Sequence, residues 1–164
     1  MHSNSTIPEL PRFYCDEMLG RLARYLRAAG FDTRLASDGA KDAVILREAV
    51  LEARWLVTLD KQILEHKAAI GSVILLSPGD MDSHAATLAR RFKLNWLQQP
   101  FSRCLVDNTP LDEAGFEQYA CVPPNSRPHA DSVKVCPCCG RVYWRGSHYR
   151  RMKDRLLSWQ STSA

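Results

Sequence analysis

Strand-like and helix-like segments alternate four times between residues 12 and 94, and this alternation constrains the fold more than any other feature. The strand-like runs are RFYC (12–15), FDTRLA (31–36), RWLVTL (54–59) and SVILL (72–76). Helix-like runs follow them at 17–30, 42–53, 61–69 and 81–94. Such alternation is typical of a mostly parallel sheet with right-handed crossovers. We therefore predict an α/β fold with a mostly parallel central sheet.

The chain changes character near Leu97–Phe101. The residues beyond are rich in proline, cysteine and turn formers, and no helical period returns until about Tyr149. Such a segment buries little apolar surface by itself, so we expect a metal ion to stabilise it. The predicted divisions are a leader (1–11), an α/β domain (12–98), an irregular metal-binding domain (99–148) and a basic C-terminal helix or tail (149–164).

The cysteines and the first residues indicate the compartment. The N-terminus lacks a basic region followed by an apolar one, so we predict no signal peptide. Six cysteines in a chain without an export signal favour metal binding over a disulfide framework. No segment is apolar over the ~18 residues that a bilayer requires. We therefore expect a cytoplasmic protein with no membrane partner.

Three aspartates occupy positions that a parallel sheet brings to one edge. Asp16 directly follows the first strand, Asp60 directly follows the third, and Asp42 begins the helix after the second. Ligands of open parallel sheets gather at the carboxyl ends of the strands. Neighbouring carboxylates repel unless a cation neutralises them, and oxygen ligands favour Mg²⁺ or Mn²⁺. The pattern predicts a metal site suited to phosphodiester hydrolysis, in which the cation stabilises charge on the phosphate and activates a water.

Two further side chains belong to this predicted catalytic site. Thr58 lies two residues before Asp60 and is expected to face the same way, where it can hold the attacking water or a metal-bound water. Asp38, four residues before Asp42, is a candidate outer carboxylate, and a plain turn is its alternative. The alternative for Asp16, Asp42 and Asp60 is that each caps the helix that follows it.

Five segments resemble, in order, the Mut-seven C-terminal ribonuclease family. They are YCDEMLGRLARYLRAAGFDT, DAVILREA, LVTLDKQIL, FSRCLVDN and CPCCGRVYWRGSHYRRM, and they extend over roughly residues 12–155. The resemblance implies a PIN-like three-layer sandwich, a C-terminal zinc ribbon and an acidic Mg²⁺ or Mn²⁺ site that cuts RNA. The acids of the family's site fall on Asp16, Asp42 and Asp60, the positions that the sheet edge selects independently.

The resemblance also implies ligands for a structural zinc ion. Of the family's two Cys-x-x-Cys pairs, the second is intact as Cys136 and Cys139. In the first, CLVD, Cys104 matches but Asp107 stands in place of the second cysteine. Aspartate can ligate zinc, so a Cys₃Asp site of reduced affinity is predicted. Other candidates for the fourth ligand are Cys138, Cys121 and His148.

The segment RVYWRGSHYRRMKDR combines cations with aromatic rings. It contains six basic residues and one acid, a net charge of +5, which leaves −1 on the rest of the chain. RNA bases stack on aromatic faces while cations meet phosphates, although a solvated helix is the alternative. For Trp144 we favour packing of the ribbon onto the α/β domain. The predicted RNA contacts are Arg145, Arg150, Arg151 and Lys153, with Arg24 and Arg27 as weaker candidates.

The leading hypothesis is a metal-dependent endoribonuclease whose zinc ribbon and basic tail help to bind RNA. One alternative is a non-catalytic RNA-binding or interaction module with a vestigial acidic site, although all three acids are present. An aspartate phosphoacceptor domain is less favoured, because no fifth strand ends in a lysine. The sequence leaves open the natural RNA, a regulatory or toxin–antitoxin partner, and the homodimer that PIN-like proteins often form.

Overall fold

The computed structural model describes residues 9–69, 71–129 and 132–163, and its first sheet has four parallel strands. The strands are β1 (Phe13–Cys15), β2 (Thr33–Leu35), β3 (Trp55–Thr58) and β4 (Val73–Leu75), in the order β2-β1-β3-β4. Tyr14 pairs with Arg34 on one side and with Leu56 on the other. Because β2 and β3 flank β1, the strand order reverses there and creates a switch point. The predicted α/β class and parallel sheet are confirmed.

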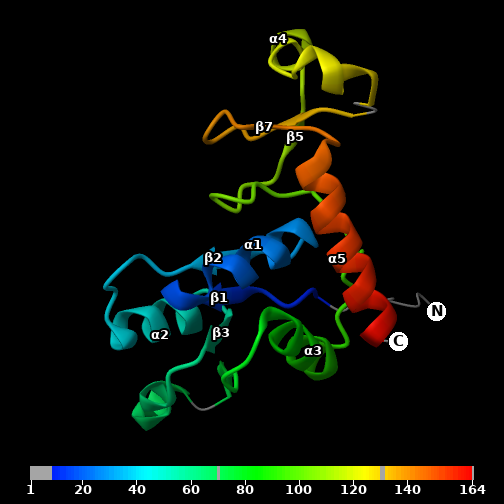
Figure 1. The fold of residues 1–164 in the computed structure, drawn as a ribbon. Coiled ribbons are helices and arrows are strands. Elements are labelled where there is room, and N and C mark those ends of the chain that lie inside the picture. The colour runs from blue at the N-terminus through cyan, green and yellow to red at the C-terminus, as the bar shows by residue number, and fades with distance from the viewer. Residues whose placement is uncertain (1–8, 70, 130–131, 164) are drawn as a thin grey trace, which may run out of the picture.

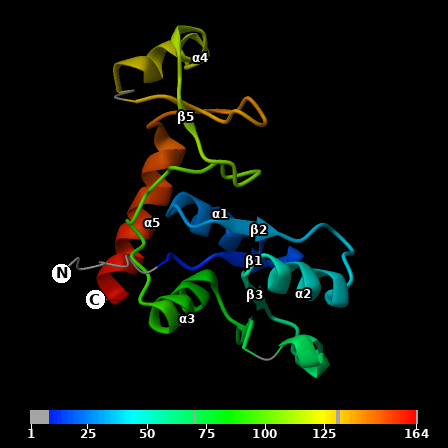
Figure 2. The ribbon, with the colours of Figure 1, turned by 180° about the vertical axis from the view of Figure 1, so that it is seen from behind.

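Helices cover both faces of this sheet (Figures 1 and 2). Side chains alternate along a strand, so Phe13 and Cys15 pack on one face and Tyr14 on the other. The first face is covered by α1 (Gly20–Ala28), α3 (Met81–Phe92) and α5 (Ser147–Ser163), and the second by α2 (Asp42–Leu51). The two apolar clusters therefore lie on opposite sides of one central sheet.

Two of the predicted helices differ from those in the structure. The segment 17–30 begins with the 3₁₀ turn η1 (Glu17–Leu19) before α1. The segment 61–69 forms no α-helix but two 3₁₀ helices, η2 (Lys61–Glu65) and η3 (Lys67–Ala69). Short helices depend on packing of an apolar stripe, and here only Ile63 and Ala69 are buried among the described side chains. The expectation of an α-helix at 61–69 was wrong for this reason.

A second, smaller sheet lies beyond the α/β core (Figure 1). Its strands β5 (Asp112–Glu113), β6 (Lys134–Val135) and β7 (Val142–Tyr143) are antiparallel and follow the order β5-β6-β7. Between β5 and β6 lie α4 (Phe116–Ala120) and the 3₁₀ helix η4 (Pro124–His129). The sequence predicted no helix in this region. α4 buries none of its side chains, so it lacks the apolar period that reveals a helix.

The C-terminal helix α5 belongs to the core and is not a solvated tail. It begins at Ser147 and packs on α1 and α3. Met152, Leu156 and Trp159 are buried on its inner face, and the Trp159 indole donates a hydrogen bond to Asp82 (2.7 Å). No helix in the described part of the chain is long and apolar enough to cross a membrane.

An ion-pair network fixes the amino edge of the parallel sheet. Arg54 donates to both carboxylate oxygens of Asp32 (2.7 and 3.2 Å), Arg12 donates to one (3.1 Å) and the Asn108 amide to the other (2.7 Å). Arg12, Asp32 and Arg54 all stand at or just before the start of a strand. Burial raises the pKa of Asp32, but hydrogen bonds from Arg54 and Asn108 outweigh it and hold the pKa well below its usual range.

This network makes stability sensitive to acid. Since the Asp32 pKa is depressed in the folded state, its contribution is complete above the unfolded pKa of about 4 and is lost as the pH falls below it. Asp32→Asn leaves the buried Arg54 short of a counter-charge and should lower the free energy of unfolding at pH 7 by about 3 kcal/mol. Urea unfolding at pH 7 and pH 3 measures both effects. The exposed Asp112→Asn is the control, and equal stability of the two variants would contradict the assignment.

Candidate functional site

The carboxyl ends of β1 and β3 place Asp16 and Asp60 on either side of Thr58. The Thr58 hydroxyl is fully buried, donates to Asp16 Oδ2 (2.9 Å) and accepts from the Asp60 backbone N–H (3.0 Å). The Asp16 N–H in turn donates to the Val57 carbonyl (3.0 Å). These bonds join the ends of two neighbouring strands at the switch point of the sheet. A single threonine therefore orients one aspartate and fixes the backbone of the other.

Asp16 and Asp60 also cap the 3₁₀ turns that follow them. Asp16 Oδ1 accepts from the Glu17 N–H (2.7 Å), and Asp60 Oδ1 accepts from the Gln62 N–H (2.8 Å). The capping interpretation is therefore correct for both residues. It does not compete with cation binding, because a carboxylate has about four lone-pair positions. Both aspartates remain half-exposed and accessible from solvent.

Asp42 is the first residue of α2, and Lys41 is the N-cap of this helix. The alternative that Asp42 caps this helix is wrong, since its carboxylate instead lies in the first turn, where the helix dipole favours negative charge. The preceding loop reaches β1 and η1, because the Gly39 N–H donates to Glu17 Oε2 (2.7 Å). Asp38 is exposed in the turn at this point. This loop contact brings the start of α2 to the same edge as Asp16.

The three aspartates do not form a compact ligand set among the described residues. Asp42 has no hydrogen bond with Asp16 or Asp60. Within residues 9–69, 71–129 and 132–163, the close group of metal-ligating side chains lies elsewhere. Joint ligation by Asp16, Asp42 and Asp60 therefore stays a prediction.

The compact cluster joins Cys104, Asp107, Cys136 and Cys139, whose ligand atoms all lie within 4.8 Å of one another. Cys104 Sγ is 3.7 Å from Cys139 Sγ, and Cys136 Sγ is 3.3 Å from the nearer oxygen of Asp107. A tetrahedral ion about 2.3 Å from sulfur and 2.0 Å from oxygen separates two sulfurs by about 3.8 Å and sulfur from oxygen by about 3.5 Å. The cluster therefore has the dimensions of a tetrahedral metal site.

Of the candidates for the fourth ligand, Asp107 is the one that lies in the cluster. Cys121, Cys138 and His148 are exposed and lie outside the cluster. Burial raises the pKa of Asp107, but hydrogen bonds from Thr109, Cys139 and Cys104 outweigh it and lower the pKa below its usual range. The carboxylate is thus ionised and ready to bind a cation at neutral pH.

The thiol of Cys139 has a raised pKa when no metal is bound. A backbone hydrogen bond at Arg141 favours the thiolate, but the hydrogen bond to Asp107 and burial raise the pKa of Cys139 to about 12. A bound cation reverses this effect, because coordination deprotonates a thiol. Metal binding at this cluster therefore releases protons.

Hydrogen bonds dock the first half of this cluster on the α/β core. Arg27 is buried and donates to the carbonyls of Thr33 (2.8 Å), Leu105 (3.0 Å) and Val106 (2.8 Å). The Thr33 N–H donates to the Asn108 side chain (2.8 Å). Arg27 therefore cannot reach RNA, and the prediction that it is a weaker RNA contact was wrong. Its buried guanidinium instead satisfies carbonyls of the loop that carries the metal ligands.

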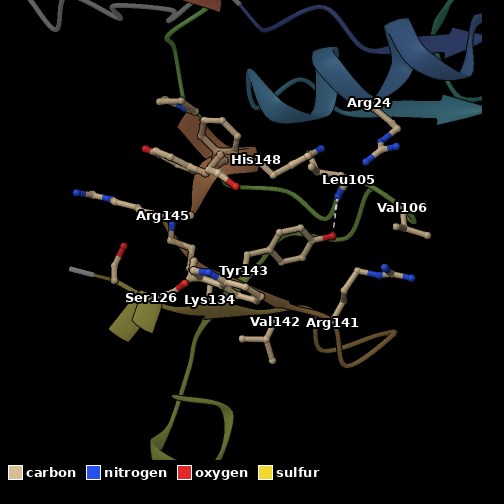
Figure 3. A pocket seen from close by; sticks show the side chains of 17 residues that line it. Arg24, Leu105, Val106, Ser126, Lys134, Arg141, Val142, Tyr143, Arg145 and His148 are labelled. Atoms are coloured by element: carbon tan, nitrogen blue, oxygen red, sulfur yellow. Dashed lines mark hydrogen bonds between the residues drawn. The ribbon is translucent and has the colours of Figure 1, made fainter. Parts of the chain in front are cut away.

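A basic and aromatic cavity of about 470 Å³ opens between the small sheet, the start of α5 and α1 (Figure 3). Its cationic lining residues are Arg24, Lys134, Arg141 and Arg145. Arg151 lines a neighbouring cavity, whereas the exposed Arg150 and Lys153 line neither. The sequence singled out neither Lys134 nor Arg141. Lys134 lies in the turn-rich region. Arg141 contributes to the charge of the basic segment but was not among the predicted RNA contacts.

Trp144 lines this cavity and joins neither apolar cluster of the described core. The expectation that it packs the small sheet onto the α/β domain was wrong. Tyr143, its neighbour on β7, packs against the core instead. Strand β7 ends at Tyr143, so the strand that carries the Tyr143 ring to the core stops before the indole of Trp144.

Removal of one thiolate tests the Cys/Asp cluster. Cys136 is fully buried, and Cys136→Ser should abolish stoichiometric metal binding because the remaining groups no longer complete a tetrahedron. Metal content after dialysis is the measurement. Cys138→Ser removes an exposed thiol outside the cluster and should keep the metal. Loss of metal in Cys138→Ser alone would contradict this ligand set.

Comparison with known proteins places the chain in a family. The model of the Mut7-C RNAse domain matches residues 11–156, most of the chain. No curated protein and no solved structure gave a significant match. The matched region contains both the acidic edge and the Cys/Asp cluster. The chain belongs to the Mut7-C RNAse domain family.

Proposed function

We propose that this chain is a metal-dependent endoribonuclease that hydrolyses RNA phosphodiester bonds at the carboxyl edge of the parallel sheet. One observation carries the proposal: Thr58 hydrogen-bonds to the Asp16 carboxylate and to the Asp60 backbone N–H at the switch point between β1 and β3. Ligands of open parallel sheets bind at such points. Membership of a ribonuclease domain family supports RNA as the substrate.

Asp16 and Asp60, with Asp42 from the first turn of α2, are the residues that would hold Mg²⁺ or Mn²⁺. When bound, the cation would neutralise phosphate charge and activate a water for in-line attack. Thr58 keeps Asp16 oriented by hydrogen bonding to its Oδ2, which leaves the Asp16 carboxylate no freedom to turn away. Asp38 is the outer carboxylate of this proposal, in the turn that Gly39 ties to Glu17. The half-exposed setting of the acids lets an extended RNA backbone approach.

The proposed architecture is a PIN-like three-layer sandwich at 12–98 followed by a zinc ribbon at 99–148. Helices on both faces of the parallel sheet support the first part. Three thiols and one carboxylate at tetrahedral spacing support zinc in the second, since thiolates favour Zn²⁺ over hard cations. A carboxylate in place of the fourth thiolate should make this zinc more exchangeable. RNA binding by Arg145, Arg150, Arg151 and Lys153 is part of the same proposal.

A non-catalytic RNA-binding module is the second candidate function. It is favoured by the open spacing of the three aspartates and by the basic cavity beside the small sheet. Such a module would bind RNA without shortening it. An aspartate phosphoacceptor role gains no support, because the described parallel sheet has four strands and no fifth that ends in a lysine.

Substitution of Asp60 separates the two candidates. Asp60→Asn keeps the cap on the Gln62 N–H but removes the charge that binds the cation, so Mn²⁺-dependent cleavage should fall at least about 100-fold. Cleavage is followed with end-labelled RNA on a denaturing gel. Glu65→Gln, an exposed carboxylate in the same 3₁₀ helix, should cut at the parental rate. Parental cleavage by Asp60→Asn would exclude this residue from the site.

Thr58 should act by positioning. Thr58→Val keeps the buried volume but removes the bond to Asp16 and leaves the Asp60 N–H unpaired, so we expect about a 10- to 100-fold loss of kcat. Thr58→Ser restores the hydroxyl and should recover most of the rate. A role confined to stability would lower the melting temperature of both variants without separating their kcat values.

A further inference from the structure

The basic cavity beside the small sheet lies at the junction of β6, β7, α5 and α1 (Figure 3), and none of the three aspartates of the acidic edge lines it. We propose that this cavity binds an unpaired nucleotide of single-stranded RNA, whose base stacks on Trp144 and whose phosphates meet Arg24 and Arg141. The choice of RNA rests on the proposed ribonuclease function. The cavity would then select single-stranded substrates and position them for cleavage at the acidic edge.

The charges of the cavity are unbalanced. Its described lining includes four cationic residues, His148 and no acid. The guanidinium groups of Arg24 and Arg141 have no hydrogen-bond or ion-pair partner in the described part of the chain, whereas Lys134 approaches the exposed Glu113 at 3.9 Å. Arg24 and Arg141 lie on one side of the Tyr143 ring in Figure 3, and Arg145 extends from the other. Cations without counter-charges, as Arg24 and Arg141 are within the described residues, suit the phosphate backbone of a nucleic acid.

Aromatic rings form the rest of the wall. Trp144 is half-buried and lies against Gly146, where an added Cβ would come within 2.9 Å of the indole Nε1. Phe101 and Tyr149 stack on one another with ring centroids 4.2 Å apart. Bases bind such faces with little sequence preference. A mixture of aromatic faces and cations is typical of sites for single-stranded nucleic acid.

The metal cluster fixes this wall. The Tyr143 hydroxyl lies 3.1 Å from Cys104 Sγ and accepts a hydrogen bond from the Leu105 N–H (3.1 Å), which Figure 3 marks. Tyr143 precedes Trp144 directly, so the backbone that carries the indole is tied to a candidate metal ligand. The cavity is therefore preorganised by the same loop that docks on the α/β core through Arg27.

A path of exposed cations connects the cavity with the acidic edge. The neighbouring cavity of about 520 Å³ shares Arg24 and His148 with the first and adds Arg21 and Arg151. Arg21 and Arg24 are exposed on one stripe of α1, three residues apart. Arg21 and Arg24 lie in the first half of α1, and Asp16 caps the 3₁₀ turn η1 that directly precedes this helix. An RNA strand held in the cavity can thus follow α1 toward Asp16.

The cavity accepts unpaired RNA in preference to a duplex. A base must leave its stack to lie on an aromatic wall, and single strands expose their bases for this while duplexes do not. A volume of about 470 Å³ falls within the usual range of small-ligand pockets. A duplex could still touch the outer cations, but it would gain nothing from Trp144.

Binding is measured in the Asp60→Asn background without added Mg²⁺ or Mn²⁺, so that the RNA stays intact and the Cys/Asp cluster keeps its metal. The probe is a labelled single-stranded RNA of about 12 nucleotides, followed by fluorescence anisotropy. Arg24→Ala with Arg141→Ala should weaken binding at least about tenfold and reduce the slope of log K against log salt by about 1.4. Trp144→Leu should also lose about tenfold, while Trp144→Phe, which keeps an aromatic face, should bind nearly as the parent does.

The control removes two cations elsewhere, with Lys67→Ala and Arg90→Ala, which are exposed and line neither basic cavity. Circular dichroism verifies that each variant is folded. An unchanged affinity and salt slope in the Arg24 and Arg141 variant, or equal binding of a blunt duplex, would overturn the proposal. Loss of binding in that variant supports the cavity even if Asp60→Asn still cleaves RNA, a result that would refute only the nuclease site.

Discussion

The Asp32 carboxylate holds together parts of the chain that are distant in sequence. Three charged residues, Arg12, Asp32 and Arg54, lie at the amino ends of three neighbouring parallel strands. Their ion pairs align the starts of these strands. Strands aligned at one edge are also aligned at the other, where Asp16 and Thr58 meet. Asn108, in the loop that carries candidate metal ligands, donates a hydrogen bond to the same carboxylate. The geometry of the acidic edge and the docking of the small sheet thus depend on one half-buried carboxylate.

The sequence was sufficient to predict the features that repeat or that depend on a strand end. Strand–helix alternation predicted the parallel sheet, because period and turn signals are local properties. The spacing of CLVD and CPCC predicted the cluster of Cys104, Asp107, Cys136 and Cys139, although each pair lies far from the other in sequence. Family resemblance joined the two pairs, and the structure brings them together. The catalytic role of the aspartates, the cytoplasmic location and the homodimer stay predictions.

Long-range polar contacts could not be predicted in the same way. Arg27 resembles an exposed helix arginine in sequence, yet it is buried because the carbonyls of Leu105 and Val106, almost eighty residues later, need a donor. The different roles of Tyr143 and Trp144 depend on where β7 ends, and a two-residue strand has no period that the sequence could reveal. The apolar face of α5 differs from these polar contacts. Residues 152, 156 and 159 have helical spacing, so this face can be predicted from the sequence.

The central claim is that the carboxyl edge of the parallel sheet binds a hard divalent cation. Anomalous diffraction from a crystal soaked in Mn²⁺ measures this directly and separates the acidic edge from the Cys/Asp cluster. The account predicts a manganese peak between the Asp16 and Asp60 carboxylates, with the Asp42 side chain turned toward it. Manganese found only at the Cys/Asp cluster, or nowhere near Asp16 and Asp60, would contradict it.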